Sequence, residues 1–160
     1  SVDIHQAAKE GNIEAVKQAI AEGADVNAMD VLLGRTPLDY AEGETVALLR
    51  KHGGKTGDWL NADESIHKAA RSGHIEAVNR QLAAGANVNA PNTYGWTALY
   101  WASSRGRKEV AELLIANGAD VNAMDVLLGW TPLDYAEGET ADLLRKHGGK
   151  TKKELKAAGI

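Results

Sequence analysis

Two segments of this chain are nearly identical, and this internal repetition restricts the possible folds more than any other feature. Residues 29–56 and 124–151 differ at only three of 28 aligned positions, Arg35/Trp130, Val46/Ala141 and Ala47/Asp142. Residues 4–28 and 66–90 form a second related pair, and residues 92–123 form one fuller copy. Repetition at this period is typical of arrays in which each repeat packs against its neighbours. We therefore divide the 160 residues into five repeats, near 2–28, 29–58, 59–91, 92–123 and 124–160.

Each repeat carries the signals of two short helices. The Thr-Pro-Leu-Asp sequence at 36–39 and again at 131–134 places threonine at the N-cap, proline at the first helical position and an acid at the third. Val110, Leu113 and Leu114 form one apolar stripe of a second helix. The turn-rich segments 25–34 and 87–95 are typical of protruding hairpins. A lone helix pair cannot bury its apolar face, so the sequence predicts a stack of such pairs.

These features resemble the ankyrin repeat, through Thr-Pro-Leu at 36–38 and Gly-Ala-Asp-Val-Asn-Ala at 23–28 and 118–123. The resemblance covers essentially the whole chain. It implies an all-α solenoid of helix–turn–helix units with protruding β-hairpin loops, which binds another folded protein through hairpin tips and first helices. His5 and His67 stand where the family usually places a hydrogen-bonding histidine. Residues 150–157 resemble a C-terminal capping extension, with a short helix expected over 152–158.

The chain also departs from the family pattern. The first helices of repeats two and five are about one turn short. Residues 55–62 look like a terminal cap, yet another repeat follows them. We expect one continuous five-repeat stack over 1–160, with two short stacks hinged near residues 57–64 as the alternative.

Composition and charge exclude several classes of protein. The 18 basic and 22 acidic residues give a formal net charge of −4, which argues against a protein that coats nucleic acid. Without cysteine there is no disulfide and no thiolate metal site. No apolar run approaches the roughly 20 residues of a membrane span, and residues 1–5 do not resemble a signal peptide. We therefore expect a cytoplasmic or recombinant protein that contacts neither membranes nor nucleic acid.

Catalytic and cofactor motifs are also missing. Residues 54–56 and 149–151 read Gly-Lys-Thr, as at the end of a phosphate-binding loop, but Leu49 and Leu144 stand where that loop needs its first glycine. We interpret both stretches as a helix stop followed by a new cap. No two of the five histidines have the i, i+4 spacing of a helical metal site. We expect no metal, no cofactor, no small-molecule substrate and no enzymatic activity.

Aromatic residues carry the functional signal, because six of the eight Trp and Tyr residues lie within residues 94–135. Two lie on a hairpin, Trp130 replaces the Arg35 of the matching copy, and Tyr100 occupies a helix position where we expect that no cap can form. Trp, Tyr and Arg dominate interface hot spots, and contiguous apolar tips mark interaction sites. The partner-binding residues we expect are Tyr94, Trp96, Tyr100, Trp101, Arg105, Arg107, Val126, Leu127, Leu128 and Trp130.

The corresponding tip of repeat two, Val31, Leu32, Leu33 and Arg35, either contacts the partner or folds back on the neighbouring hairpin. Our first functional hypothesis is an engineered or consensus-derived protein-binding array, since near-identity over 28 residues indicates recent duplication or deliberate construction. The alternatives are a self-associating structural array and a ligand-binding or enzymatic site.

Overall fold

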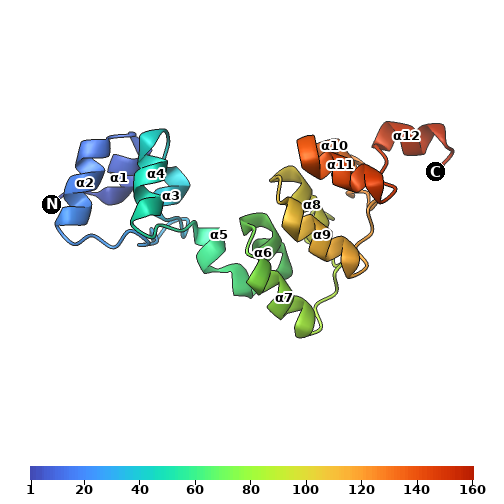
Figure 1. Cartoon of the computed structure of the whole chain (residues 1–160), viewed down its shortest axis with the longest axis horizontal. Coiled ribbons are helices and arrows are strands. Elements are labelled where there is room, and N and C mark those ends of the chain that lie inside the picture. Colours follow the sequence, from blue (N-terminus) through green and yellow to red (C-terminus); the bar gives the residue numbers. More distant parts are fainter. The chain divides into compact units, whose positions relative to one another are not determined.

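The computed structural model describes residues 1–160, which form twelve α-helices, one 3-10 helix and no β-strand. The expected all-α class is therefore confirmed. The chain divides into two compact units, an N-terminal unit of Ser1–Leu60 and a C-terminal unit of Asn61–Ile160 (Figure 1). The boundary falls inside residues 57–64, where the sequence carries its cap-like segment. The single continuous stack over all five repeats stays a prediction.

The N-terminal unit holds two helix pairs and a short closing helix. Its helices are α1 (Ile4–Lys9), α2 (Ile13–Ala21), α3 (Pro37–Tyr40), α4 (Glu44–Lys51) and α5 (Gly57–Leu60). Its core consists of small and aliphatic side chains from α1, α2 and α4, with Val16 and Leu49 fully buried. The unit thus buries the apolar faces that neither helix pair could bury alone.

The C-terminal unit stacks three helix pairs. Its elements are η1 (Ala62–Glu64), α6 (Ile66–Ser72), α7 (Ile75–Ala83), α8 (Ala98–Ser104), α9 (Lys108–Ala116), α10 (Pro132–Tyr135), α11 (Gly138–Lys146) and α12 (Lys152–Ala157). First helices pack on first helices, α6 on α8 and α8 on α10, while α7, α9 and α11 form the second layer (Figure 1). Leu99, Leu114 and Leu144 are fully buried between these layers. None of the helices in either unit has the length and apolar character needed to cross a membrane.

Capping sets where the helices begin. Thr36 and Thr131 each form a reciprocal capping box with the aspartate three residues later, and Pro follows each threonine. The chain leaves α3 and α10 in an extended conformation after only four residues, whereas α6 and α8 have seven. The expected shortening by about one turn is confirmed. Thr151 starts α12 with a third capping box.

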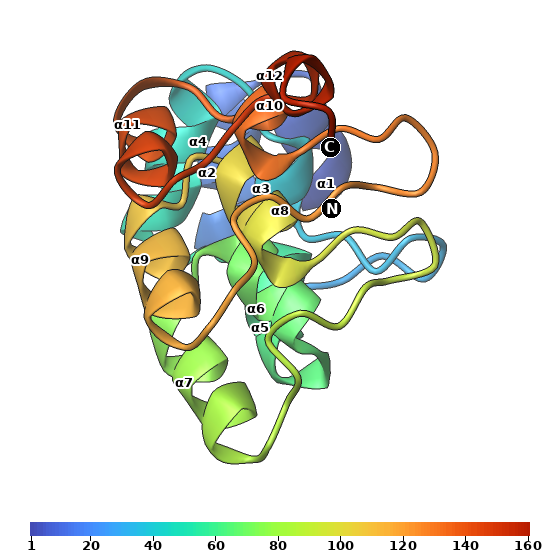
Figure 2. The same cartoon turned by 90° about the vertical axis from the view of Figure 1, so that its right-hand side faces the viewer.

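The loops between repeats turn back on themselves without forming β-strands. Two backbone hydrogen bonds close each loop. In the first, Asp30 N–H donates to Arg35 O at 2.9 Å, Asn92 N–H to Trp96 O at 2.8 Å and Asp125 N–H to Trp130 O at 3.0 Å; in the second, the N–H of the loop glycine donates to the carbonyl of Asp30, Asn92 or Asp125. In the C-terminal unit, the loops that precede α8 and α10 project from the same side (Figure 2). The protruding loops are thus present, and each is a tight turn rather than a ladder of paired strands.

The side chain at one equivalent position of each first helix forms a hydrogen bond with a main-chain atom later in the sequence. His5 Nε2 lies 2.7 Å from Ala28 O, and His67 Nε2 lies 2.8 Å from Ala90 O. This confirms the hydrogen-bonding role expected for both histidines. In repeats two and five the equivalent residue is an aspartate. Asp39 accepts the N–H of Gly57 at 2.8 Å, and Asp134 accepts the N–H of Lys152 at 2.9 Å.

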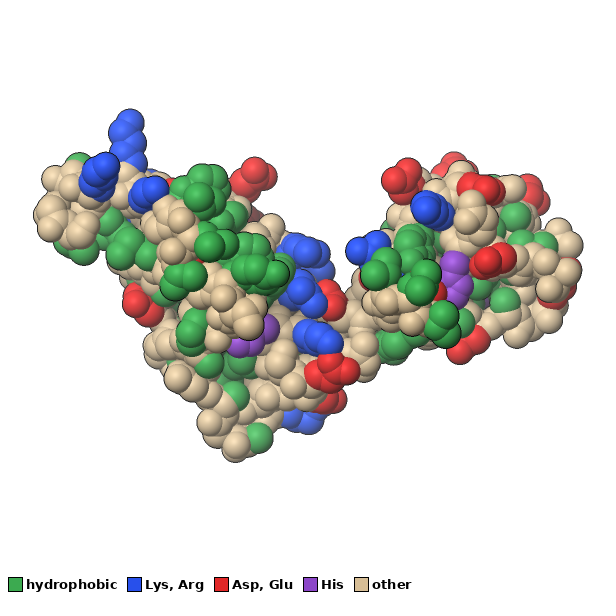
Figure 3. Space-filling model, turned by 180° about the vertical axis from the view of Figure 1, so that it is seen from behind, with side chains coloured by type: hydrophobic (Ala, Val, Ile, Leu, Met, Phe, Trp, Pro, Cys, Tyr) green, Lys and Arg blue, Asp and Glu red, His purple; other side chains and the backbone are tan.

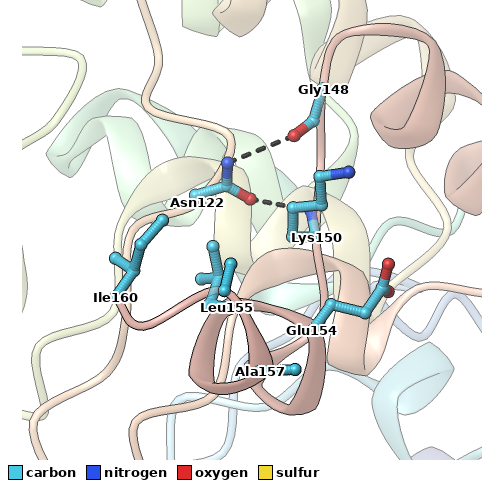
Figure 4. Close-up of a pocket in the computed structure, with 8 residues that line it drawn as sticks. Asn122, Gly148, Lys150, Glu154, Leu155, Ala157 and Ile160 are labelled. Carbon is cyan, nitrogen blue, oxygen red and sulfur yellow. Dashed lines mark hydrogen bonds between the residues drawn. The ribbon is translucent and has the colours of Figure 1, made fainter.

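The asparagine of the Val-Asn-Ala sequence forms two hydrogen bonds with the main chain of the following repeat. Asn122 Nδ2 donates to Gly148 O at 3.2 Å, and its Oδ1 accepts Lys150 N–H at 2.8 Å (Figure 4). Asn27 and Asn89 form the same pair of bonds in their repeats. Leu155 of α12 is buried beside this asparagine, so α12 covers the end of the stack.

The Gly-Lys-Thr stretches follow the ends of helices. Gly149 N–H donates to Leu144 O at 2.7 Å, which ends α11, and a Cβ at Gly149 would lie only 2.7 Å from the same oxygen. Thr151 then caps α12. Gly54 contacts Leu49 O in the same way in repeat two. The interpretation of a helix stop followed by a new cap is confirmed for residues 149–151.

Candidate functional site

Six aromatic side chains of the C-terminal unit meet in two runs of ring contacts, which we call the aromatic cluster. In the first run, the Tyr94 and Trp96 rings lie 5.6 Å apart, and those of Trp96 and Trp101 lie 5.0 Å apart at 77°. In the second run, Tyr135 lies 5.3 Å from both Tyr100 and Trp130. A small pocket lined by Trp96, Tyr100, Trp101, Ser104 and Tyr135 separates the two runs. The cluster therefore spans the loops and first helices of repeats four and five.

Exposure differs across the cluster. Tyr94 is 56% exposed and Trp130 is 38% exposed, so both present large ring areas to solvent. Trp96 and Trp101 are half-buried. The Trp96 indole N–H is buried without a hydrogen-bond acceptor, an arrangement that costs folding free energy. Such local irregularities are typical of functional positions.

Tyr100 is a correction to the expected site, because it is only 2% exposed. Its hydroxyl oxygen accepts the N–H of Asp125 at 2.9 Å, which is the role that His67 plays in repeat three. The expectation that no cap forms at this helix is wrong, because Thr97 Oγ1 accepts the Tyr100 N–H at 3.4 Å. Tyr100 therefore cannot contact a partner directly, and it positions the loop that begins at Asp125.

Burial raises the pKa of the Tyr100 phenol well above its ordinary value. The folded protein therefore holds this proton more tightly than the unfolded chain, in which tyrosine has a pKa of about 10. Unfolding becomes more favourable as the pH rises above that value, since only the unfolded chain then ionises. We expect stability to fall by about 1.4 kcal/mol for each pH unit above 10 on account of this residue.

Urea unfolding between pH 9 and pH 11.5 measures this slope. Tyr100→Phe should flatten it, whereas Tyr94→Phe should not, because the Tyr94 ring is exposed. An equal slope in wild type and Tyr100→Phe would contradict the prediction.

Arginines surround Trp101. The guanidinium carbon of Arg71 lies 4.6 Å from the ring centre, and that of Arg105 lies 5.7 Å from it. Arg107 Nε donates to Arg71 O at 3.2 Å. Sequence reasoning missed Arg71, which lies in repeat three, 30 residues before Trp101. Aligning the ends of neighbouring first helices, Arg71 with Ser104, would have placed it beside this site.

The aliphatic tips of the loops are exposed in both copies. Val126, Leu127 and Leu128 are 73%, 67% and 52% exposed. The Asp125 side chain fixes their backbone by accepting the N–H groups of residues 127, 128 and 129. A Cβ at Gly95 would lie 2.9 Å from Val126, so this tip packs against the preceding loop. The tip and the aromatic cluster are therefore neighbours.

The corresponding tip of repeat two is more exposed, with Val31 at 99%, Leu32 at 89% and Leu33 at 64%. In this conformation Val31 and Leu32 do not fold back. Arg35 lies over the Tyr40 ring at 5.6 Å, and Trp130 lies on Tyr135 in the same way. The Tyr40 hydroxyl donates to Asp30. The two loops thus share one backbone arrangement. They differ in the side chain that packs on the tyrosine ring, which is arginine in repeat two and tryptophan in repeat five.

No group of three or more His, Asp or Glu side chains could hold a metal ion. Stacked helix pairs with projecting loops and an exposed aromatic cluster define a helical repeat protein. Residues 42–125 and 66–154 match the family model for ankyrin repeats in three copies, and residues 4–31 match the model for a single ankyrin repeat. The chain belongs to the ankyrin repeat family.

Several curated proteins are similar in sequence to parts of this chain. Human mitochondrial disaggregase is 42% identical over 65 residues, 41% of this chain and 9% of that protein. The ankyrin repeat domain-containing protein SAT10 of Stachybotrys chartarum is 29% identical over 126 residues, 76% of this chain and 6% of that protein. Bovine cyclin-dependent kinase 4 inhibitor B is 28% identical over 123 residues, which cover 74% of this chain and 93% of that protein. This chain thus spans less than a tenth of the length of the first two.

Proposed function

We propose that this chain is a protein-interaction module that binds another folded protein through repeats three to five. The observation that carries the proposal is the continuity of exposed aromatic and aliphatic side chains from Tyr94 to Trp130. Such a surface, rimmed by arginine, is typical of interface hot spots. The proposed contact residues are Tyr94, Trp96, Trp101, Arg105, Arg107, Val126, Leu127, Leu128 and Trp130, with Tyr100 as their support.

The family supports this proposal. The bovine relative, which matches over nearly its whole length, is named as an inhibitor of a kinase and so acts on another protein. The near-identical copies at 29–56 and 124–151 further lead us to propose a consensus-derived or engineered array that works in the cytoplasm or as a recombinant protein.

Capture of binding partners by the full chain tests the proposal. The variant Tyr94→Ser/Leu127→Ser removes two exposed side chains and should leave the fold intact. We expect it to weaken capture of the bound protein at least tenfold, because both residues lie in the proposed contact surface. The matched control Val31→Ser/Leu32→Ser removes two still more exposed side chains from repeat two and should change capture less than twofold. Equal capture by all three proteins would contradict the proposal.

Self-association is a second candidate function, which the high exposure of Val31 and Leu32 favours. Exposed aliphatic tips of this kind can pair between copies of one chain. Light scattering after size exclusion measures the molar mass in solution. A dimer that becomes a monomer in Leu32→Ser would favour this candidate, and a monomeric wild type would exclude it.

A further inference from the structure

Charge is distributed unevenly along this chain, and its first and last segments carry opposite signs. The N-terminal unit, residues 1–60, has ten acidic and six basic residues, which account for the whole formal net charge of −4. The C-terminal unit has twelve of each. This balance depends on residues 145–156, which include six basic residues and a single acid, Glu154. Figure 3 shows Lys and Arg side chains projecting from the end of this unit.

The basic residues of 145–156 form a surface that we call the basic cap. They are Arg145, Lys146, Lys150, Lys152, Lys153 and Lys156, and all six are exposed. Arg145 pairs with Glu154 at 2.7 Å, and Lys152 Nζ donates to Leu128 O at 2.6 Å. The side chains of the other four form no ion pair within the chain. The basic cap therefore presents positive charge that the chain itself does not neutralise.

The lysines of α12 are not part of the copied sequence. The near-identity of repeats two and five ends at residue 151. Beyond it, Lys152, Lys153 and Lys156 stand where the copy in repeat two has Gly57, Asp58 and Asn61. Leu155 is the buried residue of α12, so this leucine closes the end of the stack. The exposed lysines beside it are not needed for that packing.

Repeat one carries the complementary charge. Residues 2–28 include five acidic residues and two basic ones. Glu10 and Glu22 are exposed at the C-terminal ends of α1 and α2, where each accepts a neutral amide N–H, from Gln6 at 2.8 Å and from Gln18 at 3.0 Å. Neither carboxylate pairs with lysine or arginine. The C-terminal end of a helix is the negative end of its dipole and favours cations, so both glutamates stand where an external positive charge is stabilising.

We propose that the basic cap of one copy docks on repeat one of a second copy, so that the protein associates head to tail at low ionic strength. Opposite charges on two different surfaces of one chain attract each other between copies. The contact is heterologous, and each bound copy leaves one surface open for a further copy. Exposed ion pairs are individually weak, so the assembly is weak, reversible and sensitive to salt. This inference goes beyond the proposed binding function, because it needs neither the aromatic cluster nor the loop tips.

The molar mass of the full chain in solution tests the proposal. Sedimentation velocity and light scattering measure it as a function of protein and salt concentration. We expect the mean molar mass to rise between about 20 μM and 2 mM protein in about 20 mM salt, with a Kd on the order of 1 mM. In about 500 mM salt the protein should stay monomeric, because charges are then screened within a few ångströms.

Two charge reversals of equal size identify the surface. Lys153→Glu/Lys156→Glu alters the basic cap, and Lys51→Glu/Lys55→Glu makes the same change of net charge in repeat two. We expect the first variant to weaken association by about fivefold or more and the second by less than about twofold. Because both variants have the same net charge, general repulsion between copies cannot produce this difference. Circular dichroism confirms that both fold.

A complementary pair of variants gives the most specific test. Glu10→Lys/Glu22→Lys should not associate with itself, because repeat one and the cap are then both basic. Lys153→Glu/Lys156→Glu has the opposite defect, since both of its surfaces are acidic. An equimolar mixture should form mixed assemblies, in which each surface again meets the opposite charge. Misfolding of either variant could not produce association that appears only in the mixture.

Several outcomes would overturn the inference. These are a wild type that stays monomeric in low salt, association that salt does not weaken, equal losses in the two lysine variants, or a mixture that stays monomeric. Association that Leu32→Ser abolishes would assign the contact to the loop tips, and binding of a ten-nucleotide single-stranded DNA without self-association would assign the cap to nucleic acid. None of these outcomes removes the proposed binding function, which Tyr94→Ser/Leu127→Ser tests separately.

Discussion

Replacing Trp130 with arginine is expected to abolish most partner binding while leaving the fold almost unchanged. The matching copy supplies the reason, because Arg35 occupies the same position and lies over Tyr40 as Trp130 lies over Tyr135. The loop therefore accepts either side chain, and the cost in folding free energy should stay within about 0.5 kcal/mol. If Trp130 is an anchor of the interface, the binding free energy should fall by about 2 kcal/mol or more, which is roughly a thirtyfold loss of affinity.

Melting temperature and partner affinity, measured side by side for Trp130→Arg, decide this prediction. Arg35→Trp is the reciprocal control and should leave affinity nearly unchanged, since the proposed surface lies in repeats three to five. Unchanged affinity in Trp130→Arg would remove Trp130 from the interface. A loss of stability that matches the loss of binding would show that Trp130 serves packing instead.

Truncating Leu144 to alanine should destabilise the C-terminal unit by about 2–5 kcal/mol. Leu144 of α11 is fully buried in the core of that unit. Its removal leaves a cavity that the surrounding helices cannot close without breaking their own contacts. Native domains have a free energy of unfolding of only about 5–15 kcal/mol. This single change should therefore remove a large part of that free energy.

Urea unfolding in a Trp59→Phe background measures this effect, because the remaining tryptophans, Trp96, Trp101 and Trp130, all lie in the C-terminal unit. Leu49 is the equivalent leucine of repeat two and is also fully buried. Leu49→Ala, made in a protein that keeps Trp59, should have a cost of the same size in the N-terminal unit, and its unfolding is followed by far-UV circular dichroism. A cost below about 1 kcal/mol for Leu144→Ala would show that the core is loosely packed.

Features that depend on neighbours along the chain could be predicted from the sequence. The capping boxes at Thr36 and Thr131, the shortened helices α3 and α10 and the start of α12 all follow from residues within a few positions of each other. The roles of His5 and His67 were also predictable, but through the family resemblance, because their acceptors lie 23 residues away. The all-helical class with protruding loops was also predictable, since the turn residues that reverse the chain between repeats lie next to each other in the sequence.

Features that depend on contacts between repeats were harder to predict. Tyr100 was expected at the surface because it breaks the local capping rule. Its ring is instead buried, and its hydroxyl oxygen accepts the N–H of Asp125 in the next repeat. Arg71 was missed because nothing near it in the sequence indicates Trp101, which lies in the next repeat. Periodicity shows which face of a helix points inward, but it does not show how far a long side chain reaches across that face.

Every bond described above between consecutive repeats ends on a main-chain atom. Asn122 bonds to Gly148 O and Lys150 N–H of the repeat that follows, and the Tyr100 hydroxyl oxygen accepts the N–H of Asp125. A peptide group is present whatever side chain its residue carries, so the repeat that follows can change its sequence without losing the attachment. A copied segment can for the same reason join the stack behind an unrelated neighbour. The array is thus open to growth by gene duplication, with each new copy held in place before any of its surface residues has diverged.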